Sequence, residues 1–349
     1  MTGKRKGFIW IATGGTAGHI FPALAVADEL MSRGYNVTVS TDARGKKHIS
    51  PITYRVSRVW ASGVGAKNVI FQITSLFKIG ISTVALLIGF IFQRPAKIVA
   101  FGGYSSVPVL IAGRIWRVPT FLHEQNAVIG RANKFAMPFV KTLMTSFPLE
   151  YGAYTGLPVR KEILKARPNP MPKPEPRLLV MGGSLGASIL DRVVPDAVSL
   201  LKKKLFVVHQ TRPENIEKTR KIYAKLGVKN NVLSFIRDVA TELSEASLVI
   251  CRGGAATLAE LRAVGVPALI VPLNINPDQL ANAKAFSKNG GGIVIEQTAL
   301  DADMLAKTLS GLLWNPERLK QMADLAYAPN DAAKRIADTV LGNHNVNLS

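Results

Sequence analysis

The sequence predicts an α/β protein built from two Rossmann-like, doubly wound domains that face a central cleft. Four hydrophobic runs support this prediction, because each ends in a double glycine and then continues as a helical segment. The double glycines are Gly14-Gly15, Gly102-Gly103, Gly182-Gly183 and Gly253-Gly254, so each half of the 349-residue chain contains two. Strands and helices that alternate in this way form parallel sheets, and ligands bind at the carboxyl ends of the strands.

A buried strand, a glycine turn and a helix N-terminus together form a site that favours anions. Backbone N–H groups and the positive end of the helix dipole point to one spot, which attracts phosphate or diphosphate. The spacing G-G-x-x-G occurs at Gly14–Gly18 and again at Gly182–Gly186. The motifs G-x-G-x-x-G and G-x-x-x-x-G-K-[ST] do not occur, which disfavours nicotinamide or flavin dinucleotides and P-loop nucleotide hydrolysis.

The elements expected in the first half follow the alternating pattern. Strands are expected at 7–13, 35–40, 97–101 and 118–122, and helices from Pro22 to about Arg33, over the apolar run 69–92, and from about Val107 to Trp116. Pro22 suits the first turn of a helix, where the missing N–H leaves no hydrogen bond unmade. An irregular basic loop is expected after the second strand.

The second half restarts after a proline-rich segment. Five prolines lie within 167–176, which predicts a stiff, extended linker. Beyond it we expect strands at 177–182, 205–209, 232–235, 247–251 and 267–271, and helices at 187–201, 257–264 and 278–288. The predicted domains are 1–160 and 161–330, and the amphipathic C-terminal segment, about 331–349, is expected to pack back on the first domain.

The charge distribution predicts an anionic partner. The net charge is +21, and residues 1–160 carry 19 Lys and Arg against 5 Asp and Glu. Nucleic acid is disfavoured, because the chain has no recognition motif and no interleaving of basic and aromatic residues. An acidic membrane surface and a phosphorylated substrate remain. The single cysteine, Cys251, excludes a disulfide scaffold and a cysteine-rich metal site, and no secretory signal is expected.

The run Val69–Phe92 is apolar except for a few polar residues and Lys78. Its charge-free part, Ile79–Gln93, measures about 22 Å as a helix, which is shorter than a hydrocarbon core of roughly 30 Å and disfavours a transmembrane helix. A buried core helix and an apolar face that dips into one leaflet both remain open. Cationic and aromatic residues that suit the second interpretation are Lys67, Lys78, Arg94, Lys97, Arg114, Trp116 and Arg117.

Two charged residues are candidates for binding a nucleotide. Glu260 is expected near the start of the helix after Gly253-Gly254, where a carboxylate can accept hydrogen bonds from ribose hydroxyls. The alternative role for this residue is a favourable charge near a helix N-terminus. Arg160 ends the first domain, where its guanidinium is well placed to bind a diphosphate.

The histidines and one aspartate pair offer further candidates. His19 lies at the mouth of the first glycine loop, near the expected leaving diphosphate or attacking hydroxyl. His123 ends a strand and is more typical of an orienting or core residue. Asp301 and Asp303 match the spacing of a metal-binding sugar-nucleotide motif, but helix capping is favoured. No metal site and no cofactor are predicted.

Seven motifs occur in the order typical of one family. They are Gly14–Ala25 (GGTAGHIFPALA), Phe101–Pro108 (FGGYSSVP), His123–Asn126 (HEQN), Gly156–Arg160 (GLPVR), Gly182–Ala187 (GGSLGA), Arg252–Glu260 (RGGAATLAE) and Asp278–Ala283 (DQLANA). With these motifs the chain resembles the MurG family of bacterial glycosyltransferases over almost its whole length. These enzymes add N-acetylglucosamine to the lipid-linked muramyl-pentapeptide precursor of peptidoglycan.

The resemblance implies a B-type glycosyltransferase fold, with an acceptor- and membrane-binding domain followed by a UDP-sugar-binding domain. Glu260 would bind the ribose, Ser184 and Arg160 the diphosphate, and Gln279 and Asn126 the sugar. The backbone of Ile236 would bind uracil. The full set of implied substrate-binding residues is Thr16, Ala17, Gly18, Asn126, Arg160, Ser184, Ile236, Ala255, Ala256, Thr257, Leu258, Ala259, Glu260 and Gln279.

The implied reaction transfers N-acetylglucosamine from UDP-N-acetylglucosamine, with inversion and without a metal, to the 4-hydroxyl of undecaprenyl-pyrophosphoryl-muramyl-pentapeptide. Such a step needs a base at the hydroxyl and positive electrostatics at the departing diphosphate. His19 is the favoured base, a positioning role for it stays open, and Glu124 is the competing carboxylate. The enzyme would bind peripherally to the cytoplasmic face of the bacterial membrane and serve cell-wall synthesis, cell shape and division.

The chain departs from the family pattern at three positions. Ala17 stands where glycine is usual, Leu185 replaces glutamine and Leu157 replaces asparagine. These changes put in doubt a positive φ, a polar contact near the sugar and the domain hinge, respectively. A UDP-N-acetylglucosamine 2-epimerase-like enzyme and a non-catalytic nucleotide-sugar binder remain as alternatives; the first needs no apolar membrane segment, and the second needs no His19 loop.

Overall fold

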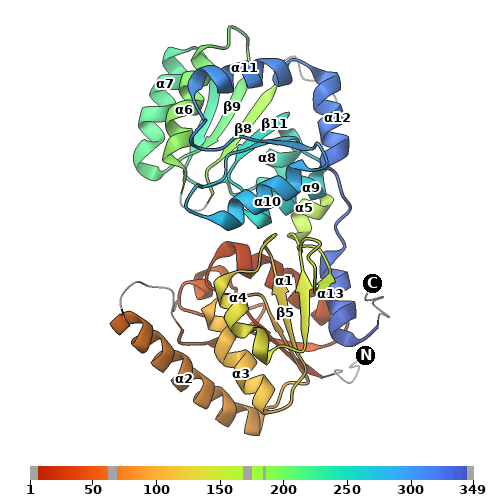
Figure 1. The fold of residues 1–349 in the computed structure, drawn as a ribbon. Coiled ribbons are helices and arrows are strands. Elements are labelled where there is room, and N and C mark those ends of the chain that lie inside the picture. The colour runs from red at the N-terminus through yellow and green to blue at the C-terminus, as the bar shows by residue number, and fades with distance from the viewer. Residues whose placement is uncertain (1–6, 62–68, 168–174, 184–185, 344–349) are drawn as a thin grey trace. The chain divides into compact units, whose positions relative to one another are not determined.

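The computed structural model describes residues 7–61, 69–167, 175–183 and 186–343, and most of the predicted linker lies outside these ranges. The chain divides into two compact units (Figure 1). Unit 1 comprises Met1–Arg160 and Asn330–Ser349, and unit 2 comprises Lys161–Pro329. The C-terminal helix α13 (Ala332–Leu341) therefore belongs to the same unit as the N-terminus.

Unit 1 contains a seven-stranded sheet in the order β3-β2-β1-β4-β5-β6-β7, in which all neighbouring strands pair in parallel. Its strands are β1 (Phe8–Ala12), β2 (Asn36–Thr41), β3 (Arg55–Arg58), β4 (Lys97–Ala100), β5 (Thr120–Glu124), β6 (Thr142–Thr145) and β7 (Ala153–Tyr154). Its other helices are α1 (Ala17–Ser32), α2 (Val69–Phe92), α3 (Val107–Ile115), α4 (Arg131–Ala136) and the short 3-10 helices η1 (Gly45–His48), η2 (Tyr104–Ser106) and η3 (Met137–Phe139). The expected irregular loop thus contains the edge strand β3.

Both faces of this sheet are covered by helices, as a parallel sheet requires. Ile9 and Ile11 of β1 pack with α1 and with Ile336 of α13. Ala12, one residue further along the same strand, packs on the other side with α2 and α3. Successive side chains of a strand point to opposite faces, so a strand buried on both sides is a continuous apolar run.

Helix α1 begins at Ala17 rather than at the predicted Pro22. The carbonyl of Thr16 accepts hydrogen bonds from the N–H groups of His19 and Ile20, which starts the helix directly after the glycine turn. Pro22 consequently lies inside the helix. The prediction was wrong because it placed Pro22 in the first turn, where proline is most favourable in a helix. The helix instead starts directly after the tight glycine turn.

Helix α2 presents two apolar faces with different surroundings. Ile79 and Phe90 are buried, and the Phe90 ring packs edge-on against Trp10 of β1, with 5.3 Å between centroids. The opposite face remains exposed and consists of Ile73, Leu76, Phe77, Ile81, Val84, Ile88, Ile91 and Phe92. The helix therefore contributes to the core of unit 1 and also leaves a large apolar surface uncovered.

Unit 2 repeats the strand order with six parallel strands, β10-β9-β8-β11-β12-β13. They are β8 (Arg177–Met181), β9 (Phe206–Gln210), β10 (Lys229–Leu233), β11 (Leu248–Cys251), β12 (Ala268–Ile270) and β13 (Gly292–Val294). Its helices are α5 (Lys161–Lys165), α6 (Ser188–Ser199), η4 (Pro213–Asn215), α7 (Ile216–Lys225), α8 (Val239–Glu245), α9 (Ala255–Val264), α10 (Pro277–Ser287), α11 (Ala302–Leu313) and α12 (Pro316–Ala326).

Side-chain caps explain where several helices of unit 2 start. Asp301 precedes α11, and its carboxylate accepts a hydrogen bond of 2.7 Å from the N–H of Met304. Asp238, Asn276 and Asn315 cap α8, α10 and α12 in the same manner. The capping role favoured for Asp301 is therefore confirmed, because its side chain satisfies a helix N–H.

We predict that Phe90→Ala lowers the free energy of unfolding by about 3–5 kcal/mol, because it empties a fully packed site in the core of unit 1. Phe92→Ala removes an equal ring that is 85% exposed and should change stability by no more than about 0.5 kcal/mol. Urea denaturation followed by circular dichroism measures both. Equal losses in the two variants would contradict the assignment of the two faces of α2.

Candidate functional site

The double glycines lie at the points where the strand order reverses. In unit 1 this reversal falls between the neighbouring strands β1 and β4, and in unit 2 it falls between β8 and β11. Each of these four strands runs directly into one of the Gly-Gly turns. In open parallel sheets, ligands bind outside the carboxyl ends of the strands at such a switch point. Each unit therefore has one candidate binding site.

The two glycine turns of unit 1 approach so closely that side chains are excluded. A Cβ added to Gly103 would lie 2.7 Å from the Cα of Gly14, a separation that real Cβ atoms do not show. Gly102 and Gly103 also adopt φ values of +75° and +78°, in the left-handed region that favours glycine. The FGGYSSVP motif thus packs its backbone against the first glycine loop.

Asp42, at the end of β2, supports the same loop from the other side. A Cβ on Gly15 would overlap its carboxylate. The carboxylate accepts hydrogen bonds from the N–H groups of Arg44 and Gly45 and pairs with the Arg44 guanidinium at 2.8 Å. Burial acts to raise the pKa of Asp42, but these hydrogen bonds and the Arg44 charge outweigh it and lower the pKa. Sequence reasoning did not identify Asp42 or Arg44.

His19 lies in the first turn of α1, and its Nδ1 is 2.5 Å from the hydroxyl of Thr16. Burial, the largest cause, and the positive charge of Arg44 together lower the pKa of His19 to about 4, although Asp42 acts to raise it. The imidazole is therefore uncharged near neutral pH. When Nδ1 donates to Thr16, the other nitrogen carries a lone pair that can accept a proton. Ala17 and Gly18 lie in the same turn.

Glu124 is a buried acceptor within the HEQN motif. One carboxylate oxygen accepts from the backbone and side-chain N–H groups of Asn126, at 2.9 and 3.1 Å. The other accepts from the N–H of Gly130 and the amide of Asn133, at 2.9 and 2.7 Å. Four donors hold this carboxylate, an arrangement that favours a loop-fixing role over that of a mobile base.

The remaining motif residues have separate partners. The Gln125 amide donates to the carbonyl of Phe101 at 2.8 Å, which ties the motif to the turn after β4. His123 is fully buried, and its Nε2 lies 2.9 Å from the carbonyl of Gly156. Arg160 places its guanidinium 5.1 Å from the ring centroid of Phe21 on α1.

In unit 2, the segment Ala255–Glu260 forms the first turns of α9. The N–H groups of a first helical turn have no acceptor within the helix and can bind an anion. Ala255 and Leu258 bury their side chains in the unit, so their backbone is the part that can serve a ligand. Glu260 lies in the second turn and is 9% exposed, slightly deeper in the helix than the sequence suggested.

The start of α10 packs against the turn after β11. A Cβ on Gly253 would overlap the backbone carbonyl of Gln279, and the Asn282 amide donates to the carbonyl of Gly253 at 3.1 Å. The side-chain carbonyl of Gln279 accepts from the N–H of Leu273 at 3.0 Å. The DQLANA and RGGAATLAE motifs are therefore brought together in space. Ile236 follows β10 and is buried, and Ser184 lies outside the described residues.

A buried polar network near the second glycine loop had no signal in the sequence. His209 at the end of β9 lies 2.9 Å from the Tyr223 hydroxyl and 3.5 Å from the carboxylate of Asp191 in the first turn of α6. Asn215 donates to the same carboxylate at 2.8 Å. Burial acts to raise the pKa of Asp191, but these contacts outweigh it and lower the pKa. The network fixes the start of α6, which follows the glycine loop.

Across the ranges that the structure describes, no group of three or more His, Cys, Asp or Glu side chains is placed to hold a metal ion. The polar groups gathered at the switch points are instead backbone N–H groups, an imidazole, carboxylates and guanidinium groups. Such a set suits a ligand that combines phosphates with hydroxyl groups.

Comparison with known proteins gives this fold and site a class. Residues 9–145 match the N-terminal domain, and residues 177–340 the C-terminal domain, of glycosyltransferase family 28. A crystal structure of Acinetobacter baumannii MurG is similar with a TM-score of 0.82 and 30% identity over 96% of this chain and 99% of that one. The kitacinnamycin glycosyltransferase, at 16% identity and a TM-score of 0.70, shares the fold. The chain is a glycosyltransferase with the two-domain B-type fold.

Curated relatives identify the family within this class. An Agrobacterium fabrum UDP-N-acetylglucosamine–N-acetylmuramyl-(pentapeptide) pyrophosphoryl-undecaprenol N-acetylglucosamine transferase is 39% identical, over 96% of this chain and 94% of the relative. The transferase of the same name from Bradyrhizobium sp. is 38% identical over 95% and 96%. The chain belongs to this family of transferases, the MurG family.

We predict that His123 makes stability depend on pH below neutrality. Burial lowers the pKa of His123 to about 4, against about 6.5 in the unfolded chain. The unfolded chain alone takes up this proton between those values, so stability falls as pH drops below 6.5, by about 2 kcal/mol at pH 5. His123→Gln keeps a donor for the Gly156 carbonyl but does not titrate.

Urea denaturation at pH 7 and pH 5 compares the wild type with this variant. The free energy of unfolding should fall more between pH 7 and pH 5 in the wild type than in the variant. An equal fall in both proteins would contradict the prediction.

Proposed function

We propose that this protein transfers N-acetylglucosamine from UDP-N-acetylglucosamine to the 4-hydroxyl of undecaprenyl-pyrophosphoryl-muramyl-pentapeptide, the step from lipid I to lipid II in peptidoglycan synthesis. The observation that carries the proposal is the full-length match to transferases of that name, at 39% identity over 96% of the chain. The strand–glycine–helix junctions at both switch points, a geometry that favours phosphate, support it independently.

We assign the donor nucleotide to unit 2. The first turn of α9 offers N–H groups and a helix dipole to the diphosphate, and we assign Glu260, in the second turn, to the ribose hydroxyls. Gln279, held against Gly253, is assigned to the sugar, and the backbone at Ile236 to the base. Ser184 and Arg160 are assigned to the diphosphate.

We assign the acceptor to unit 1. The transfer breaks the bond between the anomeric carbon and the diphosphate oxygen, forms one to the acceptor oxygen, and releases the acceptor proton. His19 is uncharged near neutral pH and so is able to receive this proton, or to orient the hydroxyl. The Glu124 carboxylate holds the loop 124–130 through Asn126 and Gly130, and we assign Glu124 a positioning role.

The exposed face of α2 supports peripheral attachment to a membrane. The helical segment Gln72–Phe92 is long and apolar enough to cross a bilayer. The mean hydropathy of its most apolar part is 2.0, and 28% of that part is buried. Spanning would pull Phe90 and Ile79 out of the core of unit 1, which makes insertion of the outer face alone the better solution. Arg94, which stacks on Trp116 at 5.9 Å, adds charge for anionic headgroups on the cytoplasmic side.

Product analysis tests the proposed reaction. The wild type, given labelled UDP-N-acetylglucosamine and the lipid-linked acceptor, should form a lipid-linked disaccharide and one UDP for each transfer. Glu260→Ala should form the same product with a KM for the donor raised by about 10- to 100-fold, because a charged hydrogen bond contributes about 1.5–3 kcal/mol. Labelled N-acetylmannosamine without acceptor, or nucleotide binding without turnover, would overturn the proposal.

We predict that His19→Ala lowers kcat by roughly 10²–10⁴ without a comparable loss of stability, if the imidazole accepts the proton. Glu124→Gln should act mainly on stability, because the amide replaces an acceptor by a donor facing N–H groups. Steady-state kinetics and thermal melting of both variants separate the two roles. A change in kcat below threefold for His19→Ala would reduce this residue to a structural part of the loop.

We predict that replacing Phe77, Ile88 and Ile91 with serine releases most of the protein from vesicles that contain anionic lipid. These side chains are 69%, 53% and 64% exposed, so the change removes insertion and leaves the core intact. Ile52→Ser, at a residue that is 96% exposed and outside α2, is the matched control. Vesicle flotation measures the bound fraction, and equal release by the control would contradict the role of α2.

A further inference from the structure

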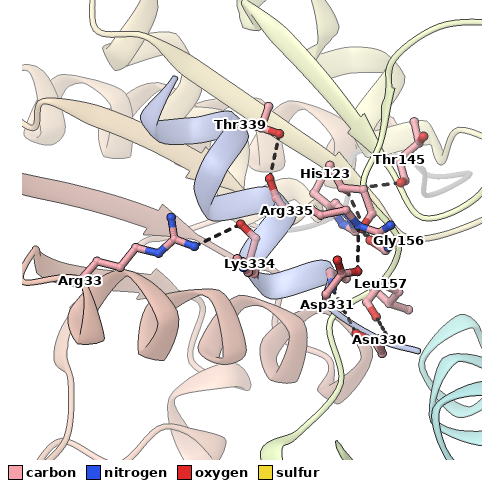
Figure 2. Close-up of polar contacts among 12 residues, drawn as sticks. Arg33, His123, Thr145, Gly156, Leu157, Asn330, Asp331, Lys334, Arg335 and Thr339 are labelled. Atoms are coloured by element: carbon pink, nitrogen blue, oxygen red, sulfur yellow. Dashed lines mark hydrogen bonds and ion pairs between the residues drawn. The ribbon is translucent and has the colours of Figure 1, made fainter. Parts of the chain in front are cut away.

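The chain passes from unit 1 to unit 2 after Arg160 and returns before Asn330. The outgoing connection therefore starts in unit 1 and the returning connection ends there, and the unit 1 residues next to these two crossings lie close together. Figure 2 shows Asn330, Arg335 and His123 around the segment that contains Gly156 and Leu157. This segment and its three partners are called the crossover clamp below.

Three successive carbonyl groups of the outgoing segment each accept a hydrogen bond from a side chain. The carbonyl of Thr155 accepts from Arg335 Nε at 3.0 Å. The carbonyl of Gly156 accepts from His123 Nε2 at 2.9 Å, and that of Leu157 from the Asn330 amide at 2.8 Å (Figure 2). Side chains that are distant in sequence thus fix three consecutive peptide groups.

The surroundings of these bonds make the clamp tight. Thr155 and Leu157 are 2% and 5% exposed, so water does not replace a lost donor without local opening. The N–H groups of Thr155 and Gly156 both donate to the carbonyl of Thr145. Gly156 adopts φ +76°, which favours glycine, and a Cβ there would lie 2.9 Å from the Arg335 guanidinium, which would have to shift.

Helix α13 gives the clamp a fixed base. Arg33 of α1 forms an ion pair with Asp338 at 2.5 Å, and Ile336, Ala337 and Val340 are buried in the core of unit 1. Arg335 is further held by an ion pair with Asp331 at 3.1 Å. The donors at Asn330 and Arg335 are therefore fixed relative to the sheet.

Arg160 lies three residues after the last clamped carbonyl. Pro158 has a fixed φ and Val159 is buried, so little freedom remains between Leu157 and the guanidinium that contacts Phe21. We propose that His123, Asn330 and Arg335 are positioning residues that hold Arg160 where it stabilises the departing diphosphate. This inference rests on the proposed function of Arg160. It gives α13 a role in catalysis, because Arg335 of this helix helps to position Arg160.

A double-mutant cycle on the transferase reaction tests the proposal. Asn330→Ala and Arg335→Met each remove one donor and should lower kcat about tenfold, with a KM for the acceptor within about twofold of the wild type. In an Arg160→Ala background the same substitutions should lower kcat by less than about twofold, because they act through the missing guanidinium. Tyr54→Phe removes the hydrogen bond from the Tyr54 hydroxyl to Asp28 of α1, outside the clamp, and should leave kcat unchanged while lowering the melting temperature.

Multiplicative losses in the Arg160→Ala background would overturn the proposal, as would a loss of kcat in Tyr54→Phe equal to that in Asn330→Ala. An Arg160→Ala enzyme with wild-type kcat would overturn it as well. Absence of transfer by the wild type would instead refute the proposed function. In that case titration with UDP still tests the clamp, since Asn330→Ala and Arg160→Ala should then weaken UDP binding to the same, non-additive extent.

Discussion

The close approach of one backbone to another at the double glycines is the constraint on which the rest of the structure depends. Gly103 lies against Gly14, Gly253 lies against the backbone of Gln279, and Gly182 lies against that of Ala187, all at distances that exclude a Cβ. This packing allows the chain to pass from each buried strand through a short turn into the following helix. It also brings the backbone N–H groups of the following helix to the switch point of each sheet, where an anion can bind.

Buried polar groups then fix the loops around these turns. Glu124 gathers four donors, Asp42 supports Gly15, and the crossover clamp holds three carbonyl groups in succession. Unpaired buried polar groups are costly, so each of these arrangements strongly favours one conformation. A transfer reaction gains from such preorganisation, because donors already in place need not reorganise as charge develops on the diphosphate.

The fold class and the motif-bearing loops could be predicted from sequence, because hydrophobic runs and Gly-Gly turns are local signals. The direction of side chains could not. Helix α2 carries apolar residues on all its sides, so its sequence does not show which of them are buried. Packing on the sheet decides that Phe90 is buried and Phe92 is exposed. The engagement of Glu124 depends on Gly130 and Asn133, and the role of His209 depends on Asp191, all contacts formed by folding. The start of α1 was predicted wrongly from Pro22, because the glycine turn before it, and not the preference of proline for a first helical turn, determines where the helix begins.

A crystal structure of the protein with UDP-N-acetylglucosamine would decide whether the switch point of unit 2 binds the donor substrate. We expect the diphosphate at the N-terminus of α9 and the ribose hydroxyls about 3 Å from the Glu260 carboxylate, a hydrogen-bonding distance. A nucleotide bound at the amino ends of the strands of unit 2, or one whose ribose has no contact with Glu260, would contradict it.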